Sequence, residues 1–179
     1  MYVVASLLNP TATHQTQEIW RWLEEHCGLA GIKLTPLPHF SWQAAEEFDL
    51  ERVEEAVRTL AEQEQPLTVH TNGLGIFTGK SPVLYTSLVK TRALLELQER
   101  VWQAVNPCAV RPNAYYEPVS WVPHVTLAYR DITPDNLTCA LQNLAFQKIA
   151  MEIRVDHLAL IYEVDGQIGI KFRYDLGKK

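Results

Sequence analysis

Two six-residue segments of this 179-residue chain share one chemical pattern. Residues 37–42 read Leu-Pro-His-Phe-Ser-Trp and residues 122–127 read Val-Pro-His-Val-Thr-Leu, so each joins proline, histidine and a hydroxyl residue with apolar residues between them. The two histidines, His39 and His124, lie nearly half the chain length apart, which fits an internal duplication that delivers one unit from each half. The repeat predicts a site built on a pair of histidines.

Strand geometry indicates what this pair could do. Side chains two positions apart on a strand share a face, so His39 lies beside Ser41 and His124 beside Thr126, while the apolar residues point to the core. Two such units across a cleft could cleave a phosphodiester. A neutral imidazole would remove a proton from the nucleophile, a protonated one would supply the leaving oxygen, and the hydroxyls would hold phosphate oxygens. This chemistry needs no metal, and the sequence lacks H-x-x-x-H, H-x-E and C-x-x-C groupings, so we expect neither metal nor cofactor.

The surrounding pattern must place these units on strands. Proline disfavours a helical conformation in the residue before it, so each histidine unit is predicted to begin an extended segment, at 39–43 and 124–130. A P-loop-like stretch at 75–81 is followed by proline and a strand-like run, which indicates a hairpin turn. Patterning elsewhere predicts strands at 2–8, 67–77, 83–89, 150–162 and 167–174, helices at 16–27, 50–64, 91–105 and 134–146, a connecting loop at 106–116 and a turn at 164–166. The interleaved order favours an α+β fold with antiparallel sheet.

Composition limits the class of protein. A hydrophobic content of 47% supports one compact domain, and no apolar stretch approaches the length of a membrane span. The three cysteines are scattered and odd in number, which favours reduced, mostly buried thiols over a disulfide framework. A net charge of −5 disfavours an extended, positively charged surface that binds nucleic acid. We therefore expect a cytoplasmic monomer without membrane contact, which takes a small nucleotide or an RNA terminus in a local pocket.

The motifs His39-Phe40-Ser41 and His124-Val125-Thr126 resemble those of the 2H phosphoesterases, which include 2'-5' RNA ligases and cyclic nucleotide phosphodiesterases. The second motif, with its flanks at 121–128, is strongly similar to the bacterial members, whereas Ser41 stands where many relatives carry threonine. The resemblance implies a single bilobal domain over residues 1–179, with pseudo-twofold duplicated antiparallel sheets, flanking helices and a central cleft. It also implies action on 2',3'-cyclic phosphates or 2'-5' linkages.

Further substrate contacts follow from the same resemblance. Many relatives place an arginine or a tyrosine five residues after the second histidine, where this chain has Tyr129 followed by Arg130. Strand alternation places Arg130 on the face of His124, so both residues remain candidates, and Tyr116 is a candidate to stack on a base. Two alternatives remain open: a binding protein for nucleotides or RNA ends that has lost turnover, and a 2'-5' RNA ligase that runs the same chemistry in reverse.

Overall fold

A computed structural model describes residues 1–164 and 166–178, and these residues form two antiparallel sheets and four α-helices. The five-stranded sheet has the order β5-β2-β1-β8-β9, and the four-stranded sheet has the order β6-β4-β3-β7. The strands are β1 (Tyr2–Leu7), β2 (His39–Phe48), β3 (Leu67–Phe77), β4 (Val83–Leu88), β5 (Ala109–Pro112), β6 (His124–Tyr129), β7 (Glu152–Val155), β8 (His157–Val164) and β9 (Gln167–Asp175). This confirms the predicted α+β fold.

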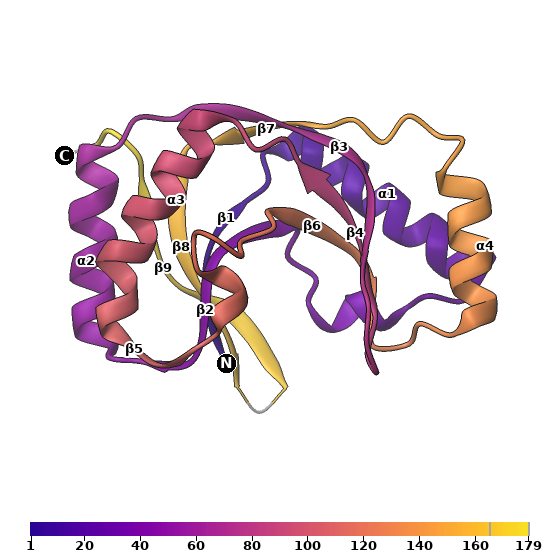
Figure 1. The fold of residues 1–179 in the computed structure, drawn as a ribbon, viewed down its shortest axis with the longest axis horizontal. Helices are drawn as coiled ribbons and strands as arrows, with labels where there is room; N and C mark the ends of the chain where they lie inside the picture. Colours follow the sequence, from indigo (N-terminus) through magenta and orange to yellow (C-terminus); the bar gives the residue numbers. More distant parts are fainter. Residues whose placement is uncertain (165, 179) are drawn as a thin grey trace.

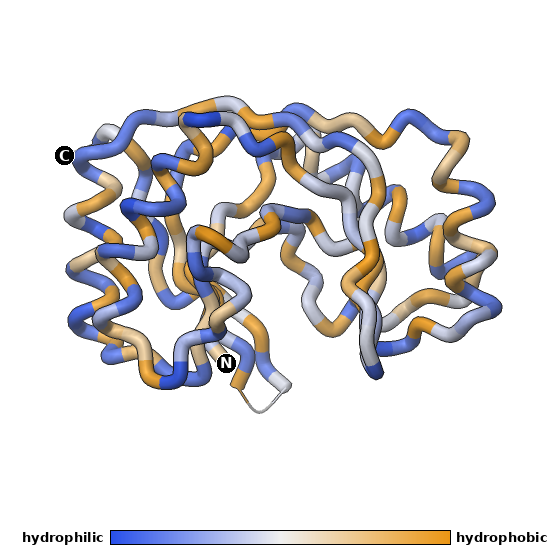
Figure 2. Tube along the Cα trace, viewed as in Figure 1, coloured by the Kyte–Doolittle hydropathy of each residue, from blue (hydrophilic) through white to orange (hydrophobic). Residues whose placement is uncertain are grey.

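Each sheet is covered by its own pair of helices (Figure 1). The helices are α1 (Pro10–Cys27), α2 (Leu50–Gln63), α3 (Arg92–Val105) and α4 (Pro134–Leu144). Helices α2 and α3 pack on the five-stranded sheet, and α1 and α4 lie beside the four-stranded sheet. Along the outer helices hydrophobic and hydrophilic residues alternate (Figure 2), because one face of each helix is buried and the other is exposed.

Local sequence signals fix the helix ends. The Asp49 carboxylate accepts a hydrogen bond from the Arg52 amide at the start of α2, and the Thr91 hydroxyl accepts one from the Leu94 amide at the start of α3, each at 3.2 Å. At the other end of α1, Gly28 adopts a left-handed conformation with φ 69°, which glycine tolerates better than other residues. The two N-caps place the starts of α2 and α3 at Leu50 and Arg92, within one residue of the predicted starts.

Several predicted elements were wrong in extent. Strand β2 continues to Phe48 rather than ending at residue 43, and α4 ends at Leu144 rather than at residue 146. Helix α1 begins at Pro10 rather than Thr16, because proline is well suited to a first helical position. The predicted loop at 106–116 contains the edge strand β5, which pairs with β2. The predicted strand at 150–162 is two strands, β7 and β8, in different sheets, because the chain crosses from one sheet to the other at Asp156. In the predicted turn at 164–166, Asp165 lies outside the described residues.

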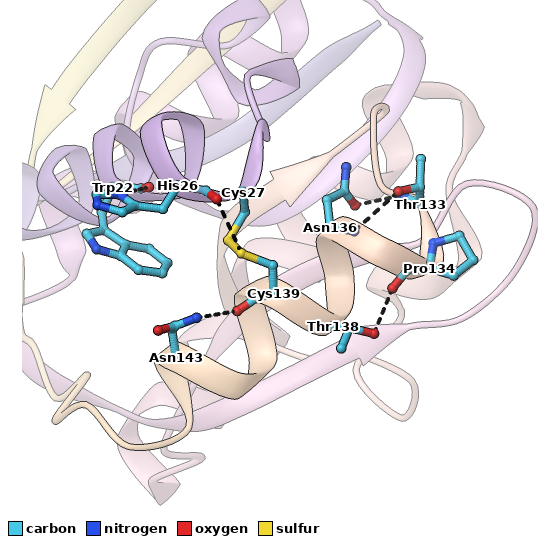
Figure 3. The surroundings of a disulfide bond; sticks show 9 residues. All are labelled: Trp22, His26, Cys27, Thr133, Pro134, Asn136, Thr138, Cys139 and Asn143. Carbon is cyan, nitrogen blue, oxygen red and sulfur yellow. Dashed lines mark hydrogen bonds between the residues drawn. A yellow bond between two sulfur atoms is a disulfide. The ribbon is translucent and has the colours of Figure 1, made fainter.

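The expectation that all three cysteines are reduced is also wrong. Cys27, at the end of α1, forms a disulfide with Cys139 in α4 (Figure 3), and Cys108 is a buried free thiol. The pairing joins residues separated by 112 positions in sequence. Only the packing of α1 against α4 brings them together, so their spacing gave no signal. None of the described helices combines the length and apolar character needed to cross a membrane.

Candidate active site

The two histidine units occupy equivalent places on different sheets. His39 is the first residue of β2 in the five-stranded sheet, and His124 is the first residue of β6 in the four-stranded sheet. Each apolar partner in the motif is at most 1% exposed, as expected from strand alternation; these partners are Phe40, Trp42, Val125 and Leu127. The histidine and hydroxyl side chains therefore lie on the opposite face from the core.

A β-bulge follows the hydroxyl residue in each unit. Between β1 and β2 the register skips Trp42, and between β4 and β6 it skips Leu127. Both are the third residue after the histidine. A bulge inserts one unpaired residue and reverses the alternation beyond it. As a result Leu127 and Ala128 are both buried, and Tyr129 returns to the face that carries His124. This corrects the expectation that Arg130 would take that place by simple alternation.

The backbone orients both imidazoles in the same way. Nδ1 of His39 lies 2.6 Å from the Leu37 carbonyl oxygen, and Nδ1 of His124 lies 2.7 Å from the Val122 carbonyl oxygen. A carbonyl oxygen can only accept, so Nδ1 donates its hydrogen in each case. The nitrogen left to gain or lose a proton is Nε2 in both residues.

Burial lowers the pKa of both histidines. For His39, desolvation of the imidazolium is the main cause, opposed by the hydrogen bond to Leu37. For His124, desolvation again comes first, and the positive charge of His39 adds to the lowering of the pKa. The two rings are therefore close enough to interact electrostatically. A charge on one disfavours a charge on the other, so the pair favours one neutral and one protonated member over two protonated members.

A cavity of about 730 Å³ lies between the sheets and is lined by residues from both. All seven residues that the sequence singled out line it: His39, Ser41, Tyr116, His124, Thr126, Tyr129 and Arg130. Much of the remaining wall comes from the β3–β4 and β8–β9 hairpins, which contribute residues such as Phe77, Val83, Ile161 and Ile168. The structure thus brings the predicted residues together, in a cavity with both polar and apolar walls.

Two tryptophans hold the backbone of the hydroxyl residues. The indole N–H of Trp121 donates to the Ser41 carbonyl at 3.0 Å, and the indole N–H of Trp20 donates to the Thr126 carbonyl at 3.0 Å. Trp121 is buried and stacks on Trp42, so its ring also packs in the core. Each indole therefore fixes the backbone of a motif strand from a different segment of the chain.

The three outer candidates have distinct surroundings. The Tyr129 hydroxyl lies 2.6 Å from the Thr35 hydroxyl, and Arg130 donates to the Glu163 carboxylate at 2.7 Å. The Arg130 guanidinium also lies 5.0 Å from the centre of the Tyr129 ring. Burial raises the pKa of Tyr116, and a hydrogen bond with the Ser41 side chain opposes this shift. Tyr116 therefore lies beside a motif hydroxyl.

Aromatic rings pack against His124. The Phe77 ring lies edge-on at 4.9 Å between centres, and the Tyr85 ring lies at 5.1 Å. Tyr85 pairs across the strands with Gly75, and a Cβ atom at Gly75 would come within 2.3 Å of the Tyr85 ring. The glycine therefore allows the tyrosine to lie flat over β3 and contact His124.

Among the cavity residues that sequence reasoning missed, three make polar contacts that hold the site: Trp20, Thr35 and Glu163. The helical pattern places Trp20 only in an apolar stripe, since such a pattern does not show where an indole N–H points. Thr35 precedes a proline-rich entry to β2, and Glu163 lies near the end of a strand next to a turn, so neither stands out by type or spacing.

Two histidine-hydroxyl units on facing antiparallel sheets define the two-histidine class of phosphoesterase fold. The chain belongs to the 2'-5' RNA ligase superfamily, whose family model matches residues 11–167. A Bacillus cytotoxicus protein provisionally named a phosphoesterase is 26% identical over 145 residues, which cover 79% of this chain and 80% of that protein. A similarly named Halalkalibacterium halodurans protein is 28% identical over 135 residues, which cover 75% and 74%. The predicted 2H phosphoesterase resemblance is confirmed.

Solved structures share the fold at low sequence identity. TT0787 of Thermus thermophilus matches with a TM-score of 0.66 and 19% identity, over 98% of this chain and 97% of that chain. E. coli LigT complexed with 3'-AMP matches with a TM-score of 0.64 and 17% identity, over 99% and 98%. The family and its relatives together support a phosphoesterase, and these structures support the fold.

Proposed function

We propose that this protein hydrolyses a 2',3'-cyclic phosphate or a 2'-5' phosphodiester of a nucleotide or RNA end, with His39 and His124 as the acid/base pair. The observation that carries the proposal is the pair itself. Two imidazoles from different sheets line one cavity, and each is fixed through Nδ1 so that Nε2 is the exchangeable nitrogen. Similarity to LigT, which has been solved with 3'-AMP, supports a nucleotide as the ligand.

The proposed reaction divides the proton transfers between the rings. Nε2 of the neutral histidine takes a proton from the attacking water, and the new P–O bond forms. Nε2 of the protonated histidine gives its proton to the leaving 2' or 3' oxygen as that P–O bond breaks. Ser41 and Thr126 hold the non-bridging oxygens, whose charge increases in the transition state. A bound phosphate anion would raise the pKa of the histidine that acts as the acid and so oppose the effect of burial.

Near-equivalent surroundings make the two roles exchangeable with substrate orientation. Ligation of 2'-5' ends is the reverse of the same proton transfers, so the proposed site could support either direction with a suitable substrate. The substrate supplied, rather than a different set of residues, would determine whether hydrolysis or ligation predominates.

The test is turnover of adenosine 2',3'-cyclic phosphate in the presence of a chelator, with the 2'- and 3'-phosphate products resolved. We expect His39→Ala and His124→Ala each to lower kcat by on the order of 10²–10⁴, the usual contribution of a general acid or base. His14→Ala is the matched control, because His14 is an exposed histidine on α1 that does not line the cavity. A variant of either motif histidine that keeps the parent rate would contradict the mechanism. Binding without turnover by the parent would favour the non-catalytic alternative.

A further inference from the structure

An ion pair joins the two sheets at the wall of the cavity. Arg130 follows β6 in the four-stranded sheet, Glu163 lies in β8 of the five-stranded sheet, and both line the cavity. The guanidinium donates to the carboxylate at 2.7 Å, with side-chain exposures of 44% for Arg130 and 27% for Glu163. A ligand in the cavity would therefore meet a cation that already has an anionic partner.

The backbone of Arg130 is unusual for this residue type. Its φ is 75°, in the left-handed region that non-glycine residues rarely adopt. Such conformations are energetically costly and tend to occur at functional sites. The contacts of the guanidinium with Glu163 and with the Tyr129 ring hold the side chain at the cavity wall despite this cost.

The charge of the cavity wall depends on this pair. Among the side chains of the described residues that line the cavity, Arg130 and Glu163 are the ones with a fixed charge near neutral pH. Burial lowers the pKa of His39 and of His124 and so disfavours a positive charge on either imidazole. The other titratable side chains in the wall are those of Tyr115, Tyr116, Tyr129 and Tyr162. The side chains of the wall therefore provide one positive charge and one negative charge that largely cancel.

The amino group of Met1 also lies at this wall. It donates to the Glu163 backbone carbonyl at 2.9 Å, so it contacts the main chain of the pair rather than its carboxylate. Its charge is unchanged by substitution of either side chain. Any difference in ligand affinity between the parent and a variant of Glu163 can therefore be assigned to the charge of the carboxylate.

We propose that Glu163 determines charge specificity: by pairing with Arg130, it makes the cavity favour a phosphodiester with one negative charge over a phosphomonoester with two. This inference rests on the proposed function. A cyclic phosphate or a 2'-5' linkage carries one negative charge, whereas the monoester product carries nearly two above its second pKa of about 6. Without the carboxylate, the unpaired guanidinium would attract the doubly charged product more strongly than the substrate. Glu163 therefore also favours product release.

The experiment compares two ligands that differ by one charge. At pH 8, 2'-deoxyadenosine 3'-monophosphate is a dianion and its methyl ester is a monoanion, and both lack the 2'-hydroxyl needed for internal attack. Calorimetry gives the affinity of each ligand for the parent and for Glu163→Gln. We expect the substitution to raise the monoester-to-diester affinity ratio by on the order of tenfold, the effect of removing one charge beside the ligand.

Three further variants make the result specific. Glu163→Asp keeps the charge and should keep the parent ratio. Glu96→Gln changes the net charge by the same amount, but at a 2.7 Å ion pair with Arg92 on α3, away from the cavity. This variant should also keep the parent affinity ratio. Arg130→Gln leaves the carboxylate unpaired and should shift the ratio toward the diester.

The outcomes separate this inference from the proposed function. An unchanged affinity ratio in Glu163→Gln, or an equal shift in Glu96→Gln, would overturn the charge-specificity role while leaving turnover of the cyclic phosphate intact. If Glu163→Gln fails to fold, an unchanged ratio in Arg130→Gln overturns it instead. If the parent neither binds these ligands nor turns over the cyclic phosphate, the proposed function fails and this inference fails with it.

Discussion

The hydrogen bond from each histidine Nδ1 to the carbonyl two residues earlier determines which nitrogen can react. In both motifs a proline lies between the histidine and that carbonyl. Its restricted backbone favours the extended path that the sequence predicted for Pro38 and Pro123. The side-chain bond itself could not be predicted, because it depends on the rotamer of the imidazole. The motif thus predicted the two proposed catalytic residues, and the structure adds which nitrogen of each is free to exchange a proton.

The pH dependence of the reaction follows from the lowered pKa values of His39 and His124. In the free enzyme both groups should titrate below about 6.5, the ordinary value for histidine. The profile of kcat/KM reports on the free enzyme, so it should be bell-shaped with its maximum below about pH 6.5. Steady-state rates on the cyclic phosphate, measured across the acidic and neutral range, would test this. A rate that rises steadily through the mildly alkaline range would contradict the assignment.

Some of the other site residues could be predicted from the sequence, and others could not. Ser41 and Thr126 were predicted because a strand has a simple two-residue period. Tyr129 and Arg130 could not be ranked, since the bulge at Leu127 that reverses the alternation depends on pairing with β4. Glu163 is near Arg130 only because β8 lies in the sheet opposite β6. Such contacts between distant segments leave no periodic signal in the sequence.

At the scale of elements, the β3–β4 hairpin has two functions, since it forms part of the cavity wall and packs on a proposed catalytic residue. Its Gly75–Tyr85 pair has a counterpart in the β8–β9 hairpin, where Gly169 pairs with Tyr162. A Cβ atom at Gly169 would come within 2.6 Å of the Tyr162 hydroxyl. The two hairpins therefore use the same cross-strand arrangement at equivalent places beside the cavity.

Gly75→Ala should displace the Tyr85 ring and disturb His124. We expect a loss of unfolding free energy of about 1–3 kcal/mol, typical of overpacking, together with a lower kcat and a shifted acidic limb of the pH profile. Gly169→Ala is the matched control, because it crowds Tyr162 rather than a ring that packs on His124. Urea unfolding and the pH profile would be measured for both. Equal pH profiles for the two variants would show that Tyr85 does not position the histidine.

Elements with a clear period or a strong cap could be predicted from the sequence, and irregular ones could not. Strand β3 was predicted with its observed limits, and α3 follows the Thr91 cap. Strand β5 was missed because Pro107, Pro112 and Asn113 are typical of a connecting loop. It is a strand because β2 presents a free edge for pairing. Tertiary pairing overrode local propensity there.

At the scale of the whole molecule, the Cys27–Cys139 disulfide holds α1 against α4 across a long stretch of sequence. The Cys27→Ser/Cys139→Ser variant should lose about 3–5 kcal/mol of unfolding free energy, as expected for a crosslink that closes a loop of this size. Urea unfolding with and without reductant would measure it, and reductant should have no effect on the double variant. Thiol titration of the unfolded parent should find one thiol, Cys108. Three titrating thiols would contradict the pairing.

The order of strands in the two sheets has a consequence for synthesis. The sheet that carries His39 combines strands from both ends of the chain, β1 and β2 with β8 and β9. As the chain leaves the ribosome, both histidine motifs emerge before β8 and β9. The first motif strand therefore cannot complete its sheet, and Arg130 cannot pair with Glu163, until β8 and β9 have been synthesised. A cut at the midpoint of the sequence would give two fragments that each lack strands of both sheets, and folding must bring distant segments together, which is characteristic of slow folding.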